Sequence, residues 1–124
     1  MIGYVTLGTN DLDRSVAFYD ALFAIFGVPR FMEQPGRFVA WATAHDAPSV
    51  CVTVPFDGAP ATVGNGVMVA LRRKNREEVD AAYRKALELG ATSEGEPGPR
   101  VAGFYVGYFR DLDGNKLNAY CVEE

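Results

Sequence analysis

Few side chains in this sequence could act as nucleophiles, general bases or ligands of a hard metal. The only histidine, His45, lies in the predicted turn His45–Pro48, where an exposed loop histidine is favoured over a catalytic base. One histidine cannot make a two-histidine iron site. No serine or cysteine stands beside a histidine in a nucleophile motif, and no glycine-rich phosphate loop is present. The residues therefore argue against nucleophilic catalysis by serine or cysteine, nucleotide binding by a phosphate loop and chemistry at a two-histidine iron site.

Two aspartates form the most conspicuous pair of carboxylates. Asp111 and Asp113 flank the predicted turn Asp113-Gly114-Asn115. An aspartate at a turn bonds the backbone close to it, so a turn role is favoured over a paired acid–base site.

The two cysteines, Cys51 and Cys121, lie far apart in predicted strands. We expect both to be buried free thiols in a reducing, cytoplasmic environment. The N-terminus shows no charged leader before an apolar stretch, and no apolar run is long enough to span a bilayer.

Composition limits the function classes further. The chain has 124 residues, 48% of them hydrophobic, which is typical of a soluble globular protein that can build an ordinary core. The formal charge of -4 argues against nucleic-acid binding, because no basic stripe is available to neutralise phosphates. The one basic cluster, Arg72–Lys74, is followed by glutamates and is typical of a solvated helix entrance.

Two helices are predicted, one after each of two apolar strands. Asn10 is a candidate N-cap for the first, which has an apolar face at helical spacing, and Gly27 can end it in the left-handed conformation. Asn75 followed by Glu78 resembles a capping box for the second, and Gly90 ends that helix.

The predicted elements occur in the same order twice: strand, helix, then three strands. The strands expected before the helices are Ile2–Gly8 and Val67–Leu71. Those expected after the first helix are Val28–Glu33, Phe38–Thr43 and Ser49–Pro55, and those after the second are Thr92–Gly95, Phe104–Arg110 and Lys116–Val122. A polar joint near Ala59–Asn65 separates the two halves. This repetition predicts an α+β architecture of two tandem modules.

Three segments carry a resemblance to a known family. The strand–turn–strand Tyr105–Asn118, with its Arg-Asp-x-Asp-Gly-Asn run, resembles the last hairpin of the vicinal-oxygen-chelate superfamily, the glyoxalase, bleomycin-resistance and dioxygenase group. Ile2–Leu22 is similar to that family's first strand and helix, and Gly64–Leu71 to the start of its second module. The resemblance implies one domain over residues 1–124, with βαβββ modules at about 1–58 and 65–124. It also implies that the curved mixed sheets form an open cup with the helices outside.

The resemblance also indicates where metal-using relatives place their ligands. The four corresponding positions are Tyr4, Met68, Asn118 and, with a less secure alignment, Cys51. A hard or borderline divalent ion prefers carboxylates and imidazoles, so we expect no such metal and no cofactor here. A Cu(I) site from Cys51 and Met68 is a weaker alternative. A histidine-containing loop of close relatives is replaced by Pro97–Gly103, where Arg100 could reach a bound anion although a solvated arginine is favoured.

Alternation along the strands gives the predicted lining of the cup. With Asn118 facing inward, its neighbours of the same parity face inward too, and Leu117, Ala119, Cys121, Tyr105 and Phe109 face the helices. Gly66, Ala70 and Val106 also share the inward parity, whereas the facing of Trp41 and Cys51 stays open, with Trp41 a candidate wall residue. The candidate ligand-binding residues are Tyr4, Thr6, Met68, Phe104, Tyr108, Asn118 and Tyr120.

Three functions are compatible with such a cup. The first is a binding protein of the bleomycin-resistance type that holds a small organic molecule without the usual divalent metal. The second is a glyoxalase-like lyase or isomerase, metal-independent or unusually metallated, with Tyr4 or Tyr108 as the proton donor. The third is a degenerate module kept for protein contacts. Relatives often cover their sheet edges with a second subunit, so the resemblance implies a homodimer; no nucleic-acid or membrane partner is expected.

Overall fold

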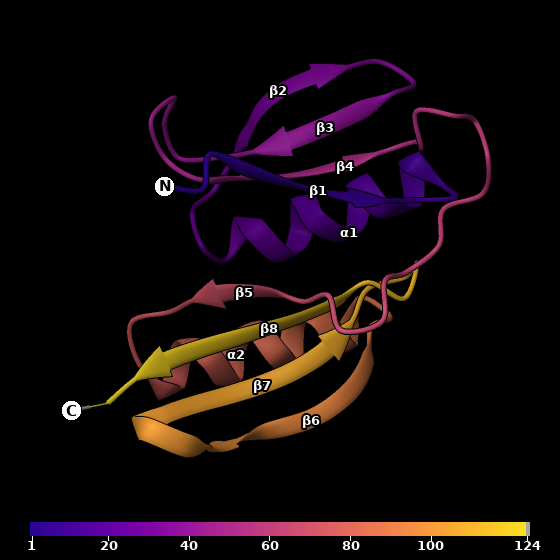
Figure 1. Ribbon diagram of the computed structural model, residues 1–124. Helices are drawn as coiled ribbons and strands as arrows, with labels where there is room; N and C mark the ends of the chain where they lie inside the picture. The colour runs from indigo at the N-terminus through magenta and orange to yellow at the C-terminus, as the bar shows by residue number, and fades with distance from the viewer. Residues whose placement is uncertain (124) are drawn as a thin grey trace. The chain divides into compact units, whose positions relative to one another are not determined.

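The computed structural model describes residues 1–123 and contains two βαβββ modules, each built from one sheet and one helix (Figure 1). The chain divides into two compact units, Met1–Val63 and a second that begins at Gly64. We call them module one and module two. Their boundary falls inside the predicted polar joint. No helix among the described residues is long and apolar enough to cross a membrane.

Module one is a mixed four-stranded sheet with helix α1 (Leu12–Ala24) on one face. The strand order is β1-β4-β3-β2, and β1 and β4 run parallel while the other pairs are antiparallel. The strands are β1 (Tyr4–Gly8), β2 (Arg30–Gln34), β3 (Phe38–Trp41) and β4 (Ser49–Thr53).

Module two repeats this arrangement with helix α2 (Arg76–Glu88). Its strand order is β5-β8-β7-β6, again with the parallel pair at one edge. The strands are β5 (Val69–Arg72), β6 (Thr92–Pro99), β7 (Phe104–Arg110) and β8 (Lys116–Val122). A short 3-10 helix, η1 (Val101–Gly103), connects β6 to β7.

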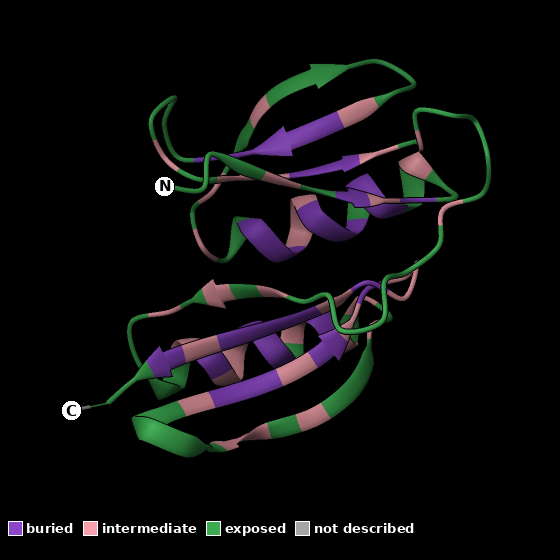
Figure 2. Ribbon diagram, in the orientation of Figure 1, coloured by how far each residue is buried: buried purple, intermediate pink, exposed green. Residues whose placement is uncertain are grey.

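In each module the core lies between the helix and the sheet. In α1, Tyr19, Leu22 and Phe23 are buried, and in α2 Val79, Ala82 and Ala86 are buried, because each helix turns one apolar stripe to its sheet. Figure 2 shows that buried residues concentrate on the central strands, whereas edge strands β2 and β6 are mostly exposed. Each sheet therefore has a helix-covered face and an opposite face, which we call the open face.

Most predicted helix and turn signals are confirmed, with one correction at the start of α1. Asn75 caps α2 by accepting from the Glu78 backbone amide at 2.9 Å, and Gly27 and Gly90 have positive φ angles. Asp11, rather than Asn10, caps α1, accepting from the Arg14 amide at 3.1 Å. Asn10 instead exchanges two hydrogen bonds with the backbone of Ala61, so a distant segment takes the side chain that the local pattern assigned to the helix.

The strand predictions were correct in order and less accurate in extent. β7 and β8 have the predicted bounds, but β6 continues to Pro99, so the predicted loop at Pro97–Gly103 is partly strand. Gly66, expected on the inward face of a strand, lies before β5 with a φ angle of 95°. Both cysteines are free and buried, as predicted.

Candidate functional site

The open face of module one contains a hollow of about 760 Å³. Alternation along the strands explains how it forms: Leu7 and Val52 point to the helix and are buried, so their neighbours of opposite parity point to the open face. Residues of all four strands and of the segment between β3 and β4 line the hollow, among them Tyr4, Thr6, Phe31, Phe38, Ala40, His45 and Cys51.

The register of the sheet explains why the centre of this face carries no large side chain. Thr6 lies opposite Cys51, and Cys51 lies opposite Ala40, so the middle row carries three small side chains. Larger side chains surround them: Tyr4 is 70% exposed and Met32 is 53% exposed. The result is a shallow floor with an aromatic and thioether rim.

The facing of Cys51, which the sequence did not predict, is toward the hollow. Burial raises the pKa of the Cys51 thiol, and a hydrogen bond with Thr6 partly opposes this. A raised pKa keeps the thiol protonated near neutral pH, because the thiolate is the form that burial disfavours. Cys51 therefore acts as a small apolar floor residue, not as an activated nucleophile.

Trp41, the other residue of unknown facing, is on the helix side. Its ring packs on Tyr19 and Phe23 with centroids 5.6 Å from each, and its Nε1 donates to Asp20 at 2.9 Å. The prediction that Trp41 is a wall residue of the site is therefore wrong. An indole with a polar handle fits the core here because Asp20 of α1 supplies the acceptor.

His45 is exposed, as predicted, yet it also forms part of the rim. Its ring lies edge-on to Phe31 with centroids 4.7 Å apart. Phe31 and His45 are outside the predicted set of site residues, because one lies on an irregular edge strand and the other in a turn. Ala40 and Phe38 could have been found from parity once Trp41 was assigned to the helix side.

The open face of module two is organised around Tyr108 and Asn118, which lie opposite each other on β7 and β8. Tyr105 donates to Asp80 of α2, and Phe109 and Leu117 are fully buried, which confirms the predicted parity of both strands. Asn118 is 5% exposed and its Nδ2 donates to the Met68 sulfur at 3.6 Å.

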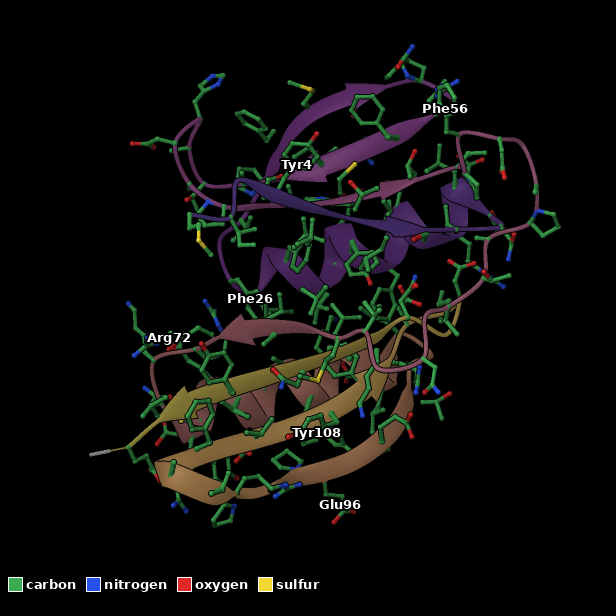
Figure 3. All side chains as sticks on the ribbon, in the orientation of Figure 1. Tyr4, Phe26, Phe56, Arg72, Glu96 and Tyr108 are labelled. Atoms are coloured by element: carbon green, nitrogen blue, oxygen red, sulfur yellow. The ribbon has the colours of Figure 1, made fainter. Side chains whose placement is uncertain are left out.

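Aromatic and cationic side chains cover the rest of that face. Phe104 and Tyr120 stack with centroids 5.3 Å apart and planes at 14°. The Tyr108 ring, labelled in Figure 3, has Arg100 and Lys116 near it. The predicted site residues thus fall into two groups: Tyr4 and Thr6 in module one, and Met68, Phe104, Tyr108, Asn118 and Tyr120 in module two.

The four positions that correspond to metal ligands in relatives do not suit a hard divalent ion. Both helices follow their first strands at the same spacing, which makes Tyr4 equivalent to Met68, and the ladders make Cys51 equivalent to Asn118. The register therefore supports the less secure alignment of Cys51. Module one supplies a phenol and a protonated thiol, and module two a thioether and an amide, all weak ligands for such ions. Among residues 1–123, no three histidine, cysteine or acidic side chains are grouped to hold a metal.

Known proteins resemble this chain over nearly its whole length. The family model for the Glyoxalase/Bleomycin resistance protein/Dioxygenase superfamily matches residues 1–119. A crystal structure described as a glyoxalase/bleomycin resistance protein from Albidiferax ferrireducens T118 is 34% identical, with 99% of each chain covered and a TM-score of 0.88.

More distant structures share the fold alone. A lactoylglutathione lyase from Agrobacterium tumefaciens is 22% identical, covering 98% of this chain and 92% of its own, with a TM-score of 0.71. A fosfomycin resistance protein from Listeria monocytogenes is 20% identical, covering 99% and 93%, with a TM-score of 0.73. None of the curated proteins compared with the chain matches it.

Proposed function

The chain belongs to the glyoxalase/bleomycin resistance protein/dioxygenase superfamily, and from that premise we propose that it binds a small organic molecule in the hollow of module one without a divalent metal. The observation that carries the proposal is the hollow itself. Its volume of about 760 Å³ lies within the range typical of ligand pockets. It is built on the face of a sheet whose other face is anchored by a helix, so the floor is held rigidly.

The walls indicate a mainly apolar ligand. Tyr4, Phe31 and Phe38 provide aromatic area, and each ring buried against a ligand contributes on the order of 1–3 kcal/mol. The polar groups are few. Ser49 donates its hydroxyl proton to the Trp41 carbonyl and Thr53 donates to the Val54 carbonyl, so both hydroxyls face the hollow as acceptors. Asp46 adds a carboxylate acceptor to the lining, so the hollow suits a ligand with an apolar body and one or two donors.

On the open face of module two, we propose a separate set of candidate ligand contacts: Met68, Phe104, Tyr108, Asn118 and Tyr120. They share one face and include stacked aromatic rings, a thioether and a buried amide. Tyr108→Phe and Asn118→Ala test these contacts with the ligand that binds the wild type most tightly. Equal affinity in the wild type and both variants would exclude Tyr108 and Asn118 as contacts.

A filling substitution tests the hollow. Ala40→Phe places a ring on the floor of the hollow and leaves the helix side of β3 unchanged. A ligand selective for the folded state raises the midpoint of thermal unfolding. For a hit from a small-molecule thermal-shift screen, we expect Ala40→Phe to abolish this rise. Ala59→Phe adds the same ring in an exposed segment outside the hollow and should retain it. Equal ligand-induced shifts in both variants would contradict the proposal.

Metal analysis tests the second part of the proposal. Protein purified without added ions should hold far less than one equivalent of Zn, Ni, Mn or Fe, because the four equivalent positions offer no carboxylate or imidazole. A stoichiometric content of any of these metals would overturn the metal-independent assignment and leave ligand binding in the hollow to be judged separately.

We also propose that the chain forms a homodimer. Each sheet has two edge strands, and such edges offer unpaired backbone groups that a second subunit can cover. Light scattering at micromolar concentration tests this, and a monomeric mass over that range would reject it.

A further inference from the structure

Tyr108 on the open face of module two has two cations against its ring. The Arg100 Cζ lies 5.6 Å from the ring centroid, and the Lys116 Nζ lies 5.3 Å from it. Within residues 1–123, neither cation forms an ion pair with a carboxylate. The nearby acid, Glu94, is paired with Arg110. Two positive charges are therefore held near one aromatic ring, Arg100 without a carboxylate partner among the described residues and Lys116 with only the longer-range attraction of Glu94, whose pKa it helps to lower.

Arg100 directly follows strand β6, and backbone carbonyls of that strand hold its side chain in position. Its Nη1 donates to the Pro99 carbonyl at 3.1 Å, and its Nη2 donates to the Glu96 carbonyl at 3.0 Å. Two glycines leave the room for it: a Cβ on Gly98 would lie 2.9 Å from Nη1, and one on Gly95 would lie 3.5 Å from Nη2. A guanidinium has five N–H donors, so those not used by the two carbonyls stay available. Arg100 is thus held in place before any ligand arrives.

A second, independent observation on the same face also points to a ligand. The Asn118 Oδ1 is buried and has no hydrogen-bond partner among the described residues, although an unpaired buried polar atom costs about 1–3 kcal/mol. Asn118 lies directly opposite Tyr108, so this acceptor belongs to the same row of side chains as the cation-bearing ring. The stacked rings of Phe104 and Tyr120 supply apolar area on the same two strands.

We propose that the open face of module two binds an aromatic carboxylate that also carries an O–H or N–H donor. The carboxylate pairs with Arg100 and Lys116, because a planar guanidinium matches a planar carboxylate and an anion relieves the repulsion between the two cations. The aromatic body of the ligand packs on the rings of this face, and its donor bonds the Asn118 Oδ1. This inference rests on the proposed role of the module-two residues as ligand contacts and not on the hollow of module one, which Ala40→Phe tests separately.

The experiment measures the affinity of 2-naphthoate and 6-hydroxy-2-naphthoate, with 2-naphthalenemethanol as the neutral probe, by titration calorimetry. We expect both carboxylates to bind and the neutral alcohol to bind at least about tenfold more weakly, since it lacks the charge-assisted pairs. Arg100→Gln and Lys116→Gln should each weaken naphthoate about tenfold or more and leave the neutral alcohol unaffected. Raising the ionic strength should weaken naphthoate alone.

Matched variants separate the site from general charge effects. Arg84→Gln removes one positive charge from an exposed position of α2 and should leave naphthoate affinity unchanged. Gly98→Ala keeps the charge of Arg100 but displaces its Nη1, so it should weaken naphthoate as well. Asn118→Ala should remove the advantage of the hydroxy derivative over plain naphthoate. Circular dichroism of each variant confirms that it is folded.

Three results would overturn the proposal. One is equal naphthoate affinity in Arg100→Gln, Lys116→Gln and Arg84→Gln. Another is equal binding of the carboxylates and the neutral alcohol. The third is loss of naphthoate binding in Ala40→Phe with full binding in Arg100→Gln, which would assign the anion to the hollow of module one. In that last case the proposed function survives and this inference fails.

Discussion

The two modules share their helix-facing residues and differ on their open faces. Counting from the helix N-caps and along the strand ladders pairs Leu7 with Leu71, Tyr19 with Tyr83 and Trp41 with Phe109. Tyr19, Trp41 and Phe109 are each at most 2% exposed, and Tyr83 is also buried. The positions that pack a helix on a sheet are therefore large and apolar in both modules, because both must exclude water from the same kind of layer.

On the open faces, a position that carries a small side chain in one module carries a large one in the other. Ala40 at the centre of module one corresponds to Tyr108, and Met32 at its edge corresponds to Gly95. Module one therefore has a hollow with a rim that includes the carboxylate of Asp46, whereas module two has a central ring with cations near it. One backbone repeat can therefore present two chemically different open faces, since open-face side chains are not constrained by core packing.

The largest expected effect on stability concerns the helix-facing core residues, which are large and apolar in both modules. Trp41→Ala and Phe109→Ala should each lower the free energy of unfolding by about 3–5 kcal/mol, because each leaves a cavity between helix and sheet. Tyr108→Ala, half-buried on the open face, should cost only about 1–2 kcal/mol. Urea denaturation measures all three, and a Tyr108→Ala cost as large as that of Phe109→Ala would break the distinction between the two faces.

The next effect concerns the connections between strands. Asp111 is buried, and its Oδ1 accepts from the Asp113 and Asn115 amides at 2.9 Å each, while its Oδ2 accepts from Asn115 Nδ2 at 3.0 Å. Asp111→Ala should cost about 2–3 kcal/mol, because buried donors lose a charged acceptor.

The corresponding connection of module one carries Asp46, which is exposed. Asp46→Ala should change the free energy of unfolding by no more than about 0.5 kcal/mol. Thermal and urea unfolding of the two variants measure the contrast, and equal losses would refute the structural role of Asp111.

A smaller effect depends on pH. Hydrogen bonding to Arg30 lowers the pKa of Asp20 below its ordinary value of 3.8. The folded state thus favours the carboxylate, so this stabilisation is present above pH 3.8 and is lost as the pH falls through the lower folded-state pKa. Because the pair is partly exposed, we expect Asp20→Asn to cost about 1 kcal/mol or less at pH 7.

The difference between wild type and Asp20→Asn should shrink as the pH falls below 3.8, which urea unfolding along a pH series measures. In module two, Arg110 lowers the pKa of Glu94, so Glu94→Gln should show the same direction with stronger screening by salt. A cost of Asp20→Asn that stays constant down to pH 2 would show that the ion pair is not its source.

The smallest effect compares the two thiols. Burial raises the pKa of both Cys51 and Cys121, so both should react slowly with iodoacetamide in the folded protein at pH 8. Cys51 should react first, because it faces the hollow while Cys121 faces α2 and is 1% exposed. Mass spectrometry after timed alkylation follows each residue. Faster modification of Cys121 would contradict the assigned parity of β8, and Cys51→Ser isolates the signal of Cys121.

Local signals carried most of the fold prediction. The N-cap Asn75, the glycines after both helices and the turn at Asp111–Asn115 each act within a few residues, so the pattern specified them correctly. The repeated strand–helix–strand order then followed from periodicity, and the family resemblance is confirmed over residues 1–119.

Predictions failed where a distant segment competes for a residue. Asn10 bonds Ala61, far along the chain, so Asp11 caps the helix instead. Strand β6 was predicted too short because its glycines and prolines disfavour a strand, yet pairing with β7 extends it to Pro99. The glycines of β6 also leave room for the Arg100 side chain beside the Tyr108 ring.

Sequence patterns alone specify the doubled module, the helices and their ends, and the parity that puts Tyr108 and Asn118 on one face of a strand pair. These features depend on periodicity and on side chains that act on their own backbone. Three features emerge only from the folded structure: Ala40 and Cys51 form the floor of a hollow, Trp41 packs on α1, and Arg100 lies near the Tyr108 ring. Those outcomes depend on strand register and on the room left by small residues in neighbouring strands, which no local pattern contains.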